Sequence, residues 1–121
     1  MILYRPVGEK EKQLIEESGF LKFPPRLSWQ PIFYPVKTKQ YAEEIASRWN
    51  TKDEQSGYKG YVTKFEIEDA YIAAFPIQTV GNSYHQEYWI PSEELEEFNQ
   101  HIIGTIEIIE EFVKRGCEEC E

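Results

Sequence analysis

Prolines and glycines break this chain into short segments, and their positions limit the folds that it can form. Of its 121 residues, seven are proline and seven are glycine, and they recur from Pro6 and Gly8 to Pro91 and Gly116. Proline disrupts helix interiors and sheet ladders, and glycine commonly ends a helix. Each helix or strand is therefore expected to be short, and the chain length fits one domain.

Hydrophobic periodicity places helices and strands between these breaks. The clearest helix follows Thr38, which is a good helix cap. Its apolar stripe consists of Tyr41, Ala42, Ile45, Ala46 and Trp49. Residues 61–67 alternate apolar and polar side chains, as a strand does. Further strands are expected at 2–5, 32–36, 77–80, 84–90 and 102–109, with helices at 9–18 and after Ser92 and a helix or turn at 68–75.

The expected order of these elements is β-α-β-α-β-(α)-β-β-α-β. A doubly wound fold would show long, regular alternation of strand and helix, whereas here short helices stand among strands joined partly by hairpins. This pattern is typical of the α+β class. The domain is expected to span residues 1–114, and residues 115–121 are expected to form an acidic, flexible tail.

Composition argues against two kinds of partner. Thirteen basic and twenty-two acidic residues give a net charge of −9, which disfavours nucleic acid because such binding depends on basic surface. No apolar run approaches the roughly 20 residues that a membrane span needs. The first residues, MILYRPVGEKEK, also lack the pattern of a signal peptide. We therefore expect a soluble, cytoplasmic protein without a membrane partner.

The sequence gives little support for a metal site. Cys117 and Cys120 form a CxxC pair near the end of the chain, but there is no second pair. The two histidines, His85 and His101, are sixteen positions apart. The motifs GxGxxG, HExxH and GxSxG and the P-loop are absent as well. No metal is expected.

One carboxylate stands inside an aromatic, strand-like run. Glu87 lies within YHQEYWI, residues 84–90, which ends at Pro91. A charge in such a segment either faces water on an edge strand or faces a cleft in which the carboxylate is used. His85, two residues before Glu87, is expected on the same strand face.

Four short segments carry a resemblance to a known family. They are Leu3-Tyr4-Arg5-Pro6, Phe33-Tyr34-Pro35-Val36 leading into a helix with Tyr41-Ala42, Tyr61-Val62-Thr63, and Gln86-Glu87-Tyr88-Trp89-Ile90. In order and approximate spacing they resemble the ADP-ribosyltransferase superfamily. Its poly(ADP-ribose) polymerase-like branch has a late strand reading asparagine-glutamate-tyrosine, and its toxin-like branches have a first-strand arginine, which Arg5 matches.

The resemblance extends to small bacterial proteins that often carry the label "ADP-ribosylation/crystallin J1". The segments of this chain that resemble those proteins are LYRPVG at the start, FPPRL and QPIFYPV in the middle, and EELEEFN near the end. The implied fold is α+β, with two small mixed or antiparallel sheets around a cleft and short flanking helices.

The resemblance implies a mono-ADP-ribosyltransferase-like protein that binds NAD as its substrate and transfers ADP-ribose to an unidentified acceptor, such as a protein. Glu87 would be the catalytic carboxylate. The ligand-binding residues would be Arg5 for pyrophosphate or ribose, Tyr34 or Tyr41 for nicotinamide, and Tyr61, Thr63 and His85 around them.

The same residues also fit roles without catalysis. Glu87 suits an exposed edge strand, and Arg5 suits an ion pair with a surface glutamate. Arg5-Pro6 replaces the first-strand histidine-glycine of the polymerase-like branch, and Phe33-Tyr34-Pro35 replaces the serine-threonine-serine of the toxin-like branch. The alternative is therefore a non-catalytic protein of the same fold that binds a protein or a nucleotide-like ligand.

Geometry separates these two hypotheses. Convergence of Glu87, Arg5 and Tyr34 on one cleft favours the enzyme. An exposed patch formed by Phe23 and Trp29, in the aromatic and proline-rich stretch FPPRLSWQP, favours the binding protein, because exposed rings commonly mark recognition surfaces.

Overall fold

The protein has a small α+β architecture. The computed structural model describes residues 1–26, 30–52, 57–79 and 85–113, and these ranges contain three small antiparallel sheets and four α-helices. The strands are β1 (Ile2–Val7), β2 (Ile32–Phe33), β3 (Lys59–Ile67), β4 (Ile77–Thr79), β5 (Gln86–Tyr88), β6 (Ile90–Pro91) and β7 (Ile102–Val113). The helices are α1 (Glu9–Glu17), α2 (Lys39–Arg48), α3 (Asp69–Ile72) and α4 (Leu95–Gln100), with 3-10 turns at Asn50–Lys52 and Ser92–Glu94. Within the described ranges, no helix is long and apolar enough to cross a membrane.

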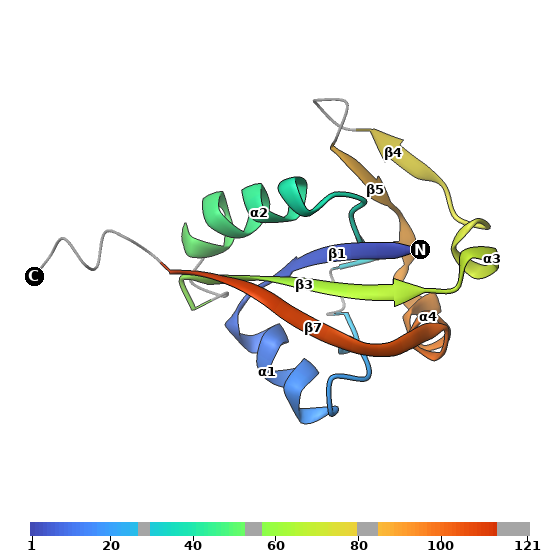
Figure 1. Cartoon of the computed structure of the whole chain (residues 1–121), viewed down its shortest axis with the longest axis horizontal. Helices are drawn as coiled ribbons and strands as arrows, with labels where there is room; N and C mark the ends of the chain where they lie inside the picture. The colour runs from blue at the N-terminus through green and yellow to red at the C-terminus, as the bar shows by residue number, and fades with distance from the viewer. Residues whose placement is uncertain (27–29, 53–56, 80–84, 114–121) are drawn as a thin grey trace, which may run out of the picture.

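The largest sheet has the order β1-β3-β7 and is antiparallel throughout. Helix α2 covers one face of this sheet and α1 covers the other, as Figure 1 shows. Successive residues of a strand point to opposite faces. Neighbouring residues of β1 therefore face different helices. Arg5 is on the face covered by α1 and contacts Glu11 of that helix.

Val36 links the largest sheet to β5, the strand that carries Glu87. Val36 exchanges two backbone hydrogen bonds with Tyr4 of β1, at 2.9 and 2.7 Å, and forms a second bridge with Glu87 of β5. The expectation of two sheets is wrong, because β2, predicted to span 32–36, ends at Phe33. Beyond Phe33 the chain leaves β6, and Val36 lies between β1 and β5.

Four phenylalanine rings pack together within the main core. Phe23 lies 5.1 Å from Phe33 and 5.0 Å from Phe65, and Phe98 lies 5.2 Å from Phe33, all measured between ring centroids. The Asn99 side chain fixes the backbone of Phe23 with hydrogen bonds of 2.9 and 3.0 Å. Phe23 is thus a core residue and not part of an exposed patch. Trp29, the other member expected in that patch, lies outside the described residues.

Helix α2 packs against the sheet through small residues. The Thr38 hydroxyl accepts a hydrogen bond from the backbone of Tyr41, as a helix cap does. Ala46 approaches β3 so closely that a Cβ atom on Gly60 would lie 2.3 Å from its carbonyl oxygen. The expectation that Trp49 would extend the buried stripe is wrong. Trp49 follows the last helical residue and is 71% exposed, since an approach this close leaves no room for a large ring.

Several element boundaries differ from the expectation, and the first strand, expected to end at residue 5, continues through Pro6 to Val7. The last strand runs to Val113 and not to residue 109. The run 84–90 is divided into β5 and β6, and residue 84 lies outside the described ranges. Ser92 does not cap α4, because it lies in a preceding 3-10 turn, and α4 buries Leu95 and Phe98. Cys117 and Cys120, in the expected tail, are outside the described residues.

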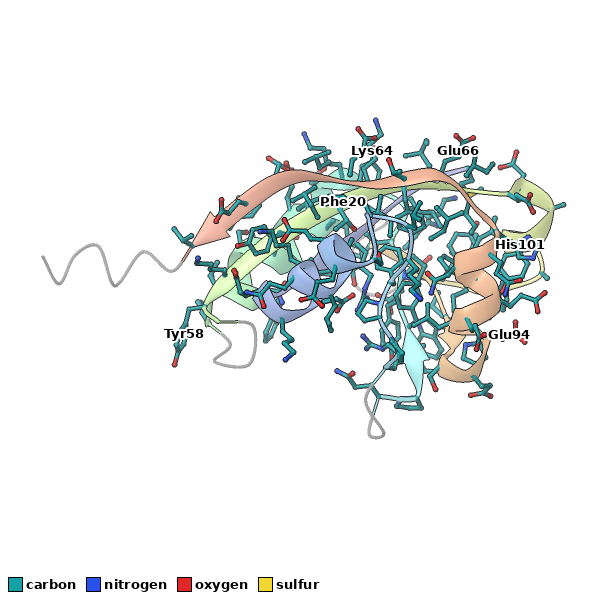
Figure 2. All side chains as sticks on the ribbon, turned by 90° about the horizontal axis from the view of Figure 1, so that it is seen from below. Phe20, Tyr58, Lys64, Glu66, Glu94 and His101 are labelled. Carbon is teal, nitrogen blue, oxygen red and sulfur yellow. The ribbon has the colours of Figure 1, made fainter. Side chains whose placement is uncertain are left out.

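His101 lies at the end of α4, near the end of the sheet where Glu94 also lies (Figure 2). Its Nδ1 atom contacts a carboxylate oxygen of Glu68 at 2.5 Å, and its ring stacks on Tyr71 with centroids 4.0 Å apart. The hydrogen bond with Glu68 raises the pKa of His101 above its ordinary value. A raised pKa in the folded state stabilises the fold at pH values below the unfolded pKa, and this contribution disappears as the pH rises through the folded value.

We expect His101→Gln to reduce the pH dependence of stability. As the pH rises from below the ordinary histidine pKa of about 6.5, the wild-type protein should lose stability relative to this variant until His101 has lost its proton. Urea unfolding of both proteins across this pH interval measures the difference. Glu68→Gln should remove the same pH-dependent part of the stability. If the free energies of unfolding of wild type and His101→Gln differ by the same amount at every pH, Glu68 does not raise the pKa of His101.

Candidate functional site

A cleft of about 310 Å³ opens beside the Val36 bridge. Because Val36 stands between Tyr4 and Glu87, β1 and β5 are two strand spacings apart here, roughly 9–10 Å. Six of the lining residues are Arg5 and Pro6 from β1, Tyr34 and Val36 from the segment after β2, Glu87 from β5, and Trp89. The structure therefore brings Arg5, Tyr34 and Glu87 together around one cleft.

Two donors orient the carboxylate of Glu87. The Tyr41 hydroxyl donates to Oε2 at 3.0 Å, and Trp89 Nε1 donates to Oε1 at 2.9 Å. Burial, followed by the effect of Glu87, raises the pKa of Tyr41 to about 12, so its hydroxyl keeps its proton at neutral pH. A carboxylate has about four acceptor positions, and these two bonds leave others for a ligand. Glu87 is half-buried and held in place, unlike a freely exposed charge on an edge strand.

His85 and Tyr41 lie behind Glu87 and support it. The His85 ring stacks on the Tyr41 ring with centroids 4.4 Å apart and a 17° angle between planes. His85 Nε2 also lies 3.2 Å from a carboxylate oxygen of Glu44 on α2. The expected placement of His85 and Glu87 on one strand face is confirmed, because both contact Tyr41. In the part of the chain that the structure describes, neither His85 nor Tyr41 is among the cleft-lining residues.

Arg5 is a cleft residue whose donors face mainly away from Glu87. It is 7% exposed, and its Nε and Nη2 atoms donate to the two carboxylate oxygens of Glu11 on α1, at 2.8 and 3.1 Å. Its Nη1 atom lies 3.4 Å from the backbone oxygen of Tyr34, and the guanidinium stands 4.5 Å above the Phe33 ring. The ion pair with a glutamate is thus present, but it is largely buried and not on the surface.

Tyr34 and Trp89 form an aromatic rim on the cleft. Their rings meet edge to face, with centroids 6.0 Å apart, and the residues are 37% and 38% exposed. The sequence interpretation did not select Trp89. Its position two residues after Glu87 was the available signal, since alternate residues of an extended segment share a face.

Tyr61 and Thr63 are not brought to this cleft. Thr63 pairs with Arg5 in the sheet, is fully buried and donates its hydroxyl to the Arg5 backbone oxygen at 2.8 Å. Tyr61 donates to Glu9 of α1 at 2.6 Å and lines a separate groove of about 630 Å³ between α1 and β7. Both residues belong to β3, the middle strand, so β1 separates them from the cleft.

Arg26 is a second arginine in this region that sequence reasoning did not select. Its Nε atom is buried and has no hydrogen-bond partner among the described residues. Burial, with a smaller effect of the positive charge on Arg5, lowers the pKa of Arg26 to about 10, while Glu11 and Tyr34 act in the opposite direction. The group remains protonated at neutral pH. Its position within FPPRL, among apolar residues and prolines, was the signal available in the sequence.

Comparisons of the chain with protein-family models, with curated proteins and with solved structures find no match. Among residues 1–26, 30–52, 57–79 and 85–113, no three His, Cys, Asp or Glu side chains gather in a group that could hold a metal ion. The functional interpretation therefore rests on the geometry of the cleft and on the resemblance of its sequence segments.

Proposed function

We propose that this cleft binds NAD or a related ADP-ribosyl ligand, and that the protein transfers ADP-ribose from NAD to an acceptor with Glu87 as the catalytic carboxylate. The observation that carries the proposal is that Glu87, Arg5 and Tyr34 line one cleft and that both oxygens of Glu87 are fixed by donors. The resemblance of four sequence segments to the ADP-ribosyltransferase superfamily supports the same ligand.

The size and lining of the cleft suit half of a dinucleotide. Small-molecule sites range from about 300 to 1,000 Å³, and this cleft of about 310 Å³ is at the lower end. We infer that it takes the nicotinamide and its ribose, while the remainder of NAD extends over the rim. The exposed rings of Tyr34 and Trp89 offer aromatic surface against which a nicotinamide ring can pack.

In the proposed reaction, the bond between ribose C1′ and the nicotinamide nitrogen breaks. The electron pair leaves with nicotinamide, which becomes neutral, and C1′ develops positive charge in an oxocarbenium-like state. The acceptor atom then bonds to C1′ and releases its proton to solvent. Glu87 would accept a hydrogen bond from the ribose 2′-hydroxyl and stabilise the developing charge, which a fixed carboxylate does without reorganising.

Binding is tested by calorimetry with NAD. We expect a measurable heat of binding at or below millimolar NAD. ADP-ribose should compete with NAD and abolish this heat. A wild-type protein that shows no binding at millimolar NAD would overturn the proposal. Nicotinamide release in the presence of a nucleophile then tests the chemical step.

Tyr41→Phe is expected to lower kcat by roughly 10- to 100-fold with little change in KM, because a hydrogen bond to a charged group contributes about 1.5–3 kcal/mol. The substitution removes the donor to Glu87 Oε2 and keeps the ring that stacks on His85. Tyr71→Phe is the matched control, since it removes a tyrosine bond to Glu94, away from the cleft. Equal effects of the two substitutions on kcat would contradict a positioning role for Tyr41.

One observation favours a second candidate, a non-catalytic receptor for the same ligand. Glu11 already occupies Nε and Nη2 of Arg5, so the protein itself satisfies a cation that was expected to contact substrate. The receptor would bind NAD without releasing nicotinamide. Turnover by the wild-type protein and its loss in a Glu87 variant would exclude this candidate.

A further inference from the structure

We propose that the outer edge of β7, together with α1, binds a basic, extended peptide segment of another protein as an added strand. This binding goes beyond the proposed function and does not depend on it, because the groove between α1 and β7 shares no described lining residue with the cleft at Glu87. Three properties of the groove carry the inference: an unpaired strand edge, an apolar floor and an excess of carboxylates.

Strand β7 is the outer strand of the largest sheet. The sheet order is β1-β3-β7, and within the described ranges no strand pairs with the side of β7 that faces away from β3 (Figure 1). The strand is also long, with 12 residues from Ile102 to Val113. Such an edge presents backbone N–H and C=O groups that can pair with another chain.

The direction of the backbone groups follows from the ladder. In antiparallel sheets, successive residues of a strand direct their N–H and C=O groups to opposite sides. Tyr4 exchanges its hydrogen bonds with Val36, on the side away from β3, so the next residue, Arg5, pairs with Thr63 of β3. The backbone groups of Thr63 are thus directed to β1. Ile108 of β7, which lies opposite Thr63, therefore directs its own groups outward.

A hydrogen bond at the preceding outward position supports this direction. The backbone N–H of Ile106, two residues before Ile108, donates to the backbone oxygen of Phe20 at 2.7 Å. Phe20 lies between α1 and β7 in Figure 2. Among the described residues, the backbone N–H and C=O of Ile108 have no hydrogen-bond partner. They form a donor and acceptor pair of the kind that an added strand uses.

The floor of the groove is apolar. The groove has a volume of about 630 Å³, and its lining includes Phe20, Ile106 and Ile108. Ile106 is buried, and the other two side chains pack against the main core. In an antiparallel pair, the residue directly opposite Ile108 has its side chain on the same face of the sheet. We therefore expect an apolar, β-branched residue at this position of the peptide.

Carboxylates outnumber cations around the groove. Lys12 is the one basic side chain among the described lining residues, and Glu16 pairs with it at 3.1 Å. On β7, Glu107 and Glu111 are exposed at the groove. Opposite charges at facing positions of neighbouring strands stabilise their pairing, whereas like charges destabilise it. Lysine or arginine is thus expected beside the apolar residue. A second copy of β7 would place glutamates near glutamates, in a chain of net charge −9.

The probe is a short synthetic peptide in which lysine alternates with valine and both ends are blocked. Calorimetry with the full chain at physiological ionic strength should detect its binding, and a peptide with glutamate in place of lysine should not bind. Methylation of the backbone nitrogens of the lysine peptide should abolish binding, because it removes the N–H donors and keeps the charge. Exchange of the Ile108 amide hydrogen should slow when the lysine peptide binds.

Three variants test the position of the peptide. Glu107→Lys is expected to weaken binding by about 3- to 10-fold, because cross-strand attraction becomes repulsion. Glu96→Lys makes the same change of charge at an exposed position of α4 outside the groove and should alter the affinity by less than about twofold. Ile108→Pro removes the outward N–H and should weaken binding by about 10-fold or more. Proline is tolerated on edge strands where the N–H faces outward.

Each outcome decides whether the edge binds a peptide. No binding of the lysine peptide at millimolar concentration overturns the inference. Equal binding of the methylated peptide, or equal losses in Glu107→Lys and Glu96→Lys, also overturns it, because charge alone would then explain the affinity. A dimer in sedimentation that Ile108→Pro dissociates would assign the edge to a second copy instead. Circular dichroism checks the fold of each variant, and the peptide comparisons need only the wild-type protein.

Discussion

Glu87→Gln is expected to lower the rate of NAD cleavage by about 10²–10³-fold, the loss commonly seen when one fixed electrostatic group is removed from a site of charge development. Glutamine keeps the size of the side chain but loses the negative charge. Its amide can also accept from only one of the two donors, Tyr41 or Trp89, and presents an NH₂ group to the other. Affinity for NAD should change little, since the charge is needed most in the transition state.

The measurement is nicotinamide release by the variant and the wild type, with NAD affinity taken from calorimetry. Glu94→Gln is a matched control, because Glu94 also accepts a hydrogen bond from a tyrosine, Tyr71, at a distance of 3.3 Å. Glu94 is not among the residues described around the cleft. Cleavage by Glu87→Gln at the wild-type rate, or equal losses in both variants, would sink the catalytic assignment.

Phe33→Ala is expected to reduce the free energy of unfolding by about 3–5 kcal/mol, the usual cost of removing a buried aromatic ring. The Phe33 ring is fully buried and packs between Phe23 and Phe98. It also carries the Arg5 guanidinium on one face, so the variant should lose ligand affinity along with stability. Urea unfolding followed by tryptophan fluorescence measures the change.

The next residue supplies the control for this prediction. Tyr34→Ala removes a ring that is 37% exposed, so it should cost less than about 1 kcal/mol of stability. Phe33→Leu retains most of the volume and should give a smaller loss than alanine in the same direction, which keeps the test usable if the alanine variant does not fold. Similar losses for Phe33→Ala and Tyr34→Ala would contradict the central place of Phe33 in the core.

Those features of the fold that depend on local sequence were predictable. The cap at Thr38 and the alternation in 61–67 identify α2 and β3, because both signals lie within one segment. The division into three sheets was not predictable, since it depends on Val36 meeting Tyr4 and Glu87, which are distant in the chain. The exposure of Trp49 was missed because periodicity gives the face of a helix but not how closely that face approaches the sheet.

In the candidate site, too, local motifs were predictable from the sequence, whereas contacts between distant residues were not. Arg5, Tyr34 and Glu87 were selected from short motifs, and the structure brings them to one cleft. Their individual contacts could not be read from the sequence. Glu11 reaches Arg5 because α1 folds back under β1, and the bond between Tyr41 and Glu87 joins residues 46 positions apart. The ligand-binding roles of these residues remain predictions until NAD is tested.

The close approach at Gly60 has a consequence for the cleft. Helix α2 rests on β3 at this glycine, and the same helix carries Tyr41 toward Glu87 and contributes Ile45 to the cleft wall. Because position 60 has no side chain, α2 can lie directly against β3, and this contact fixes the position of the helix that carries Tyr41 and Ile45. Even one methyl group there would act as a wedge that tilts the helix outward and lengthens the reach of the Tyr41 hydroxyl. The shape of the cleft therefore depends on Gly60, a residue outside the described lining.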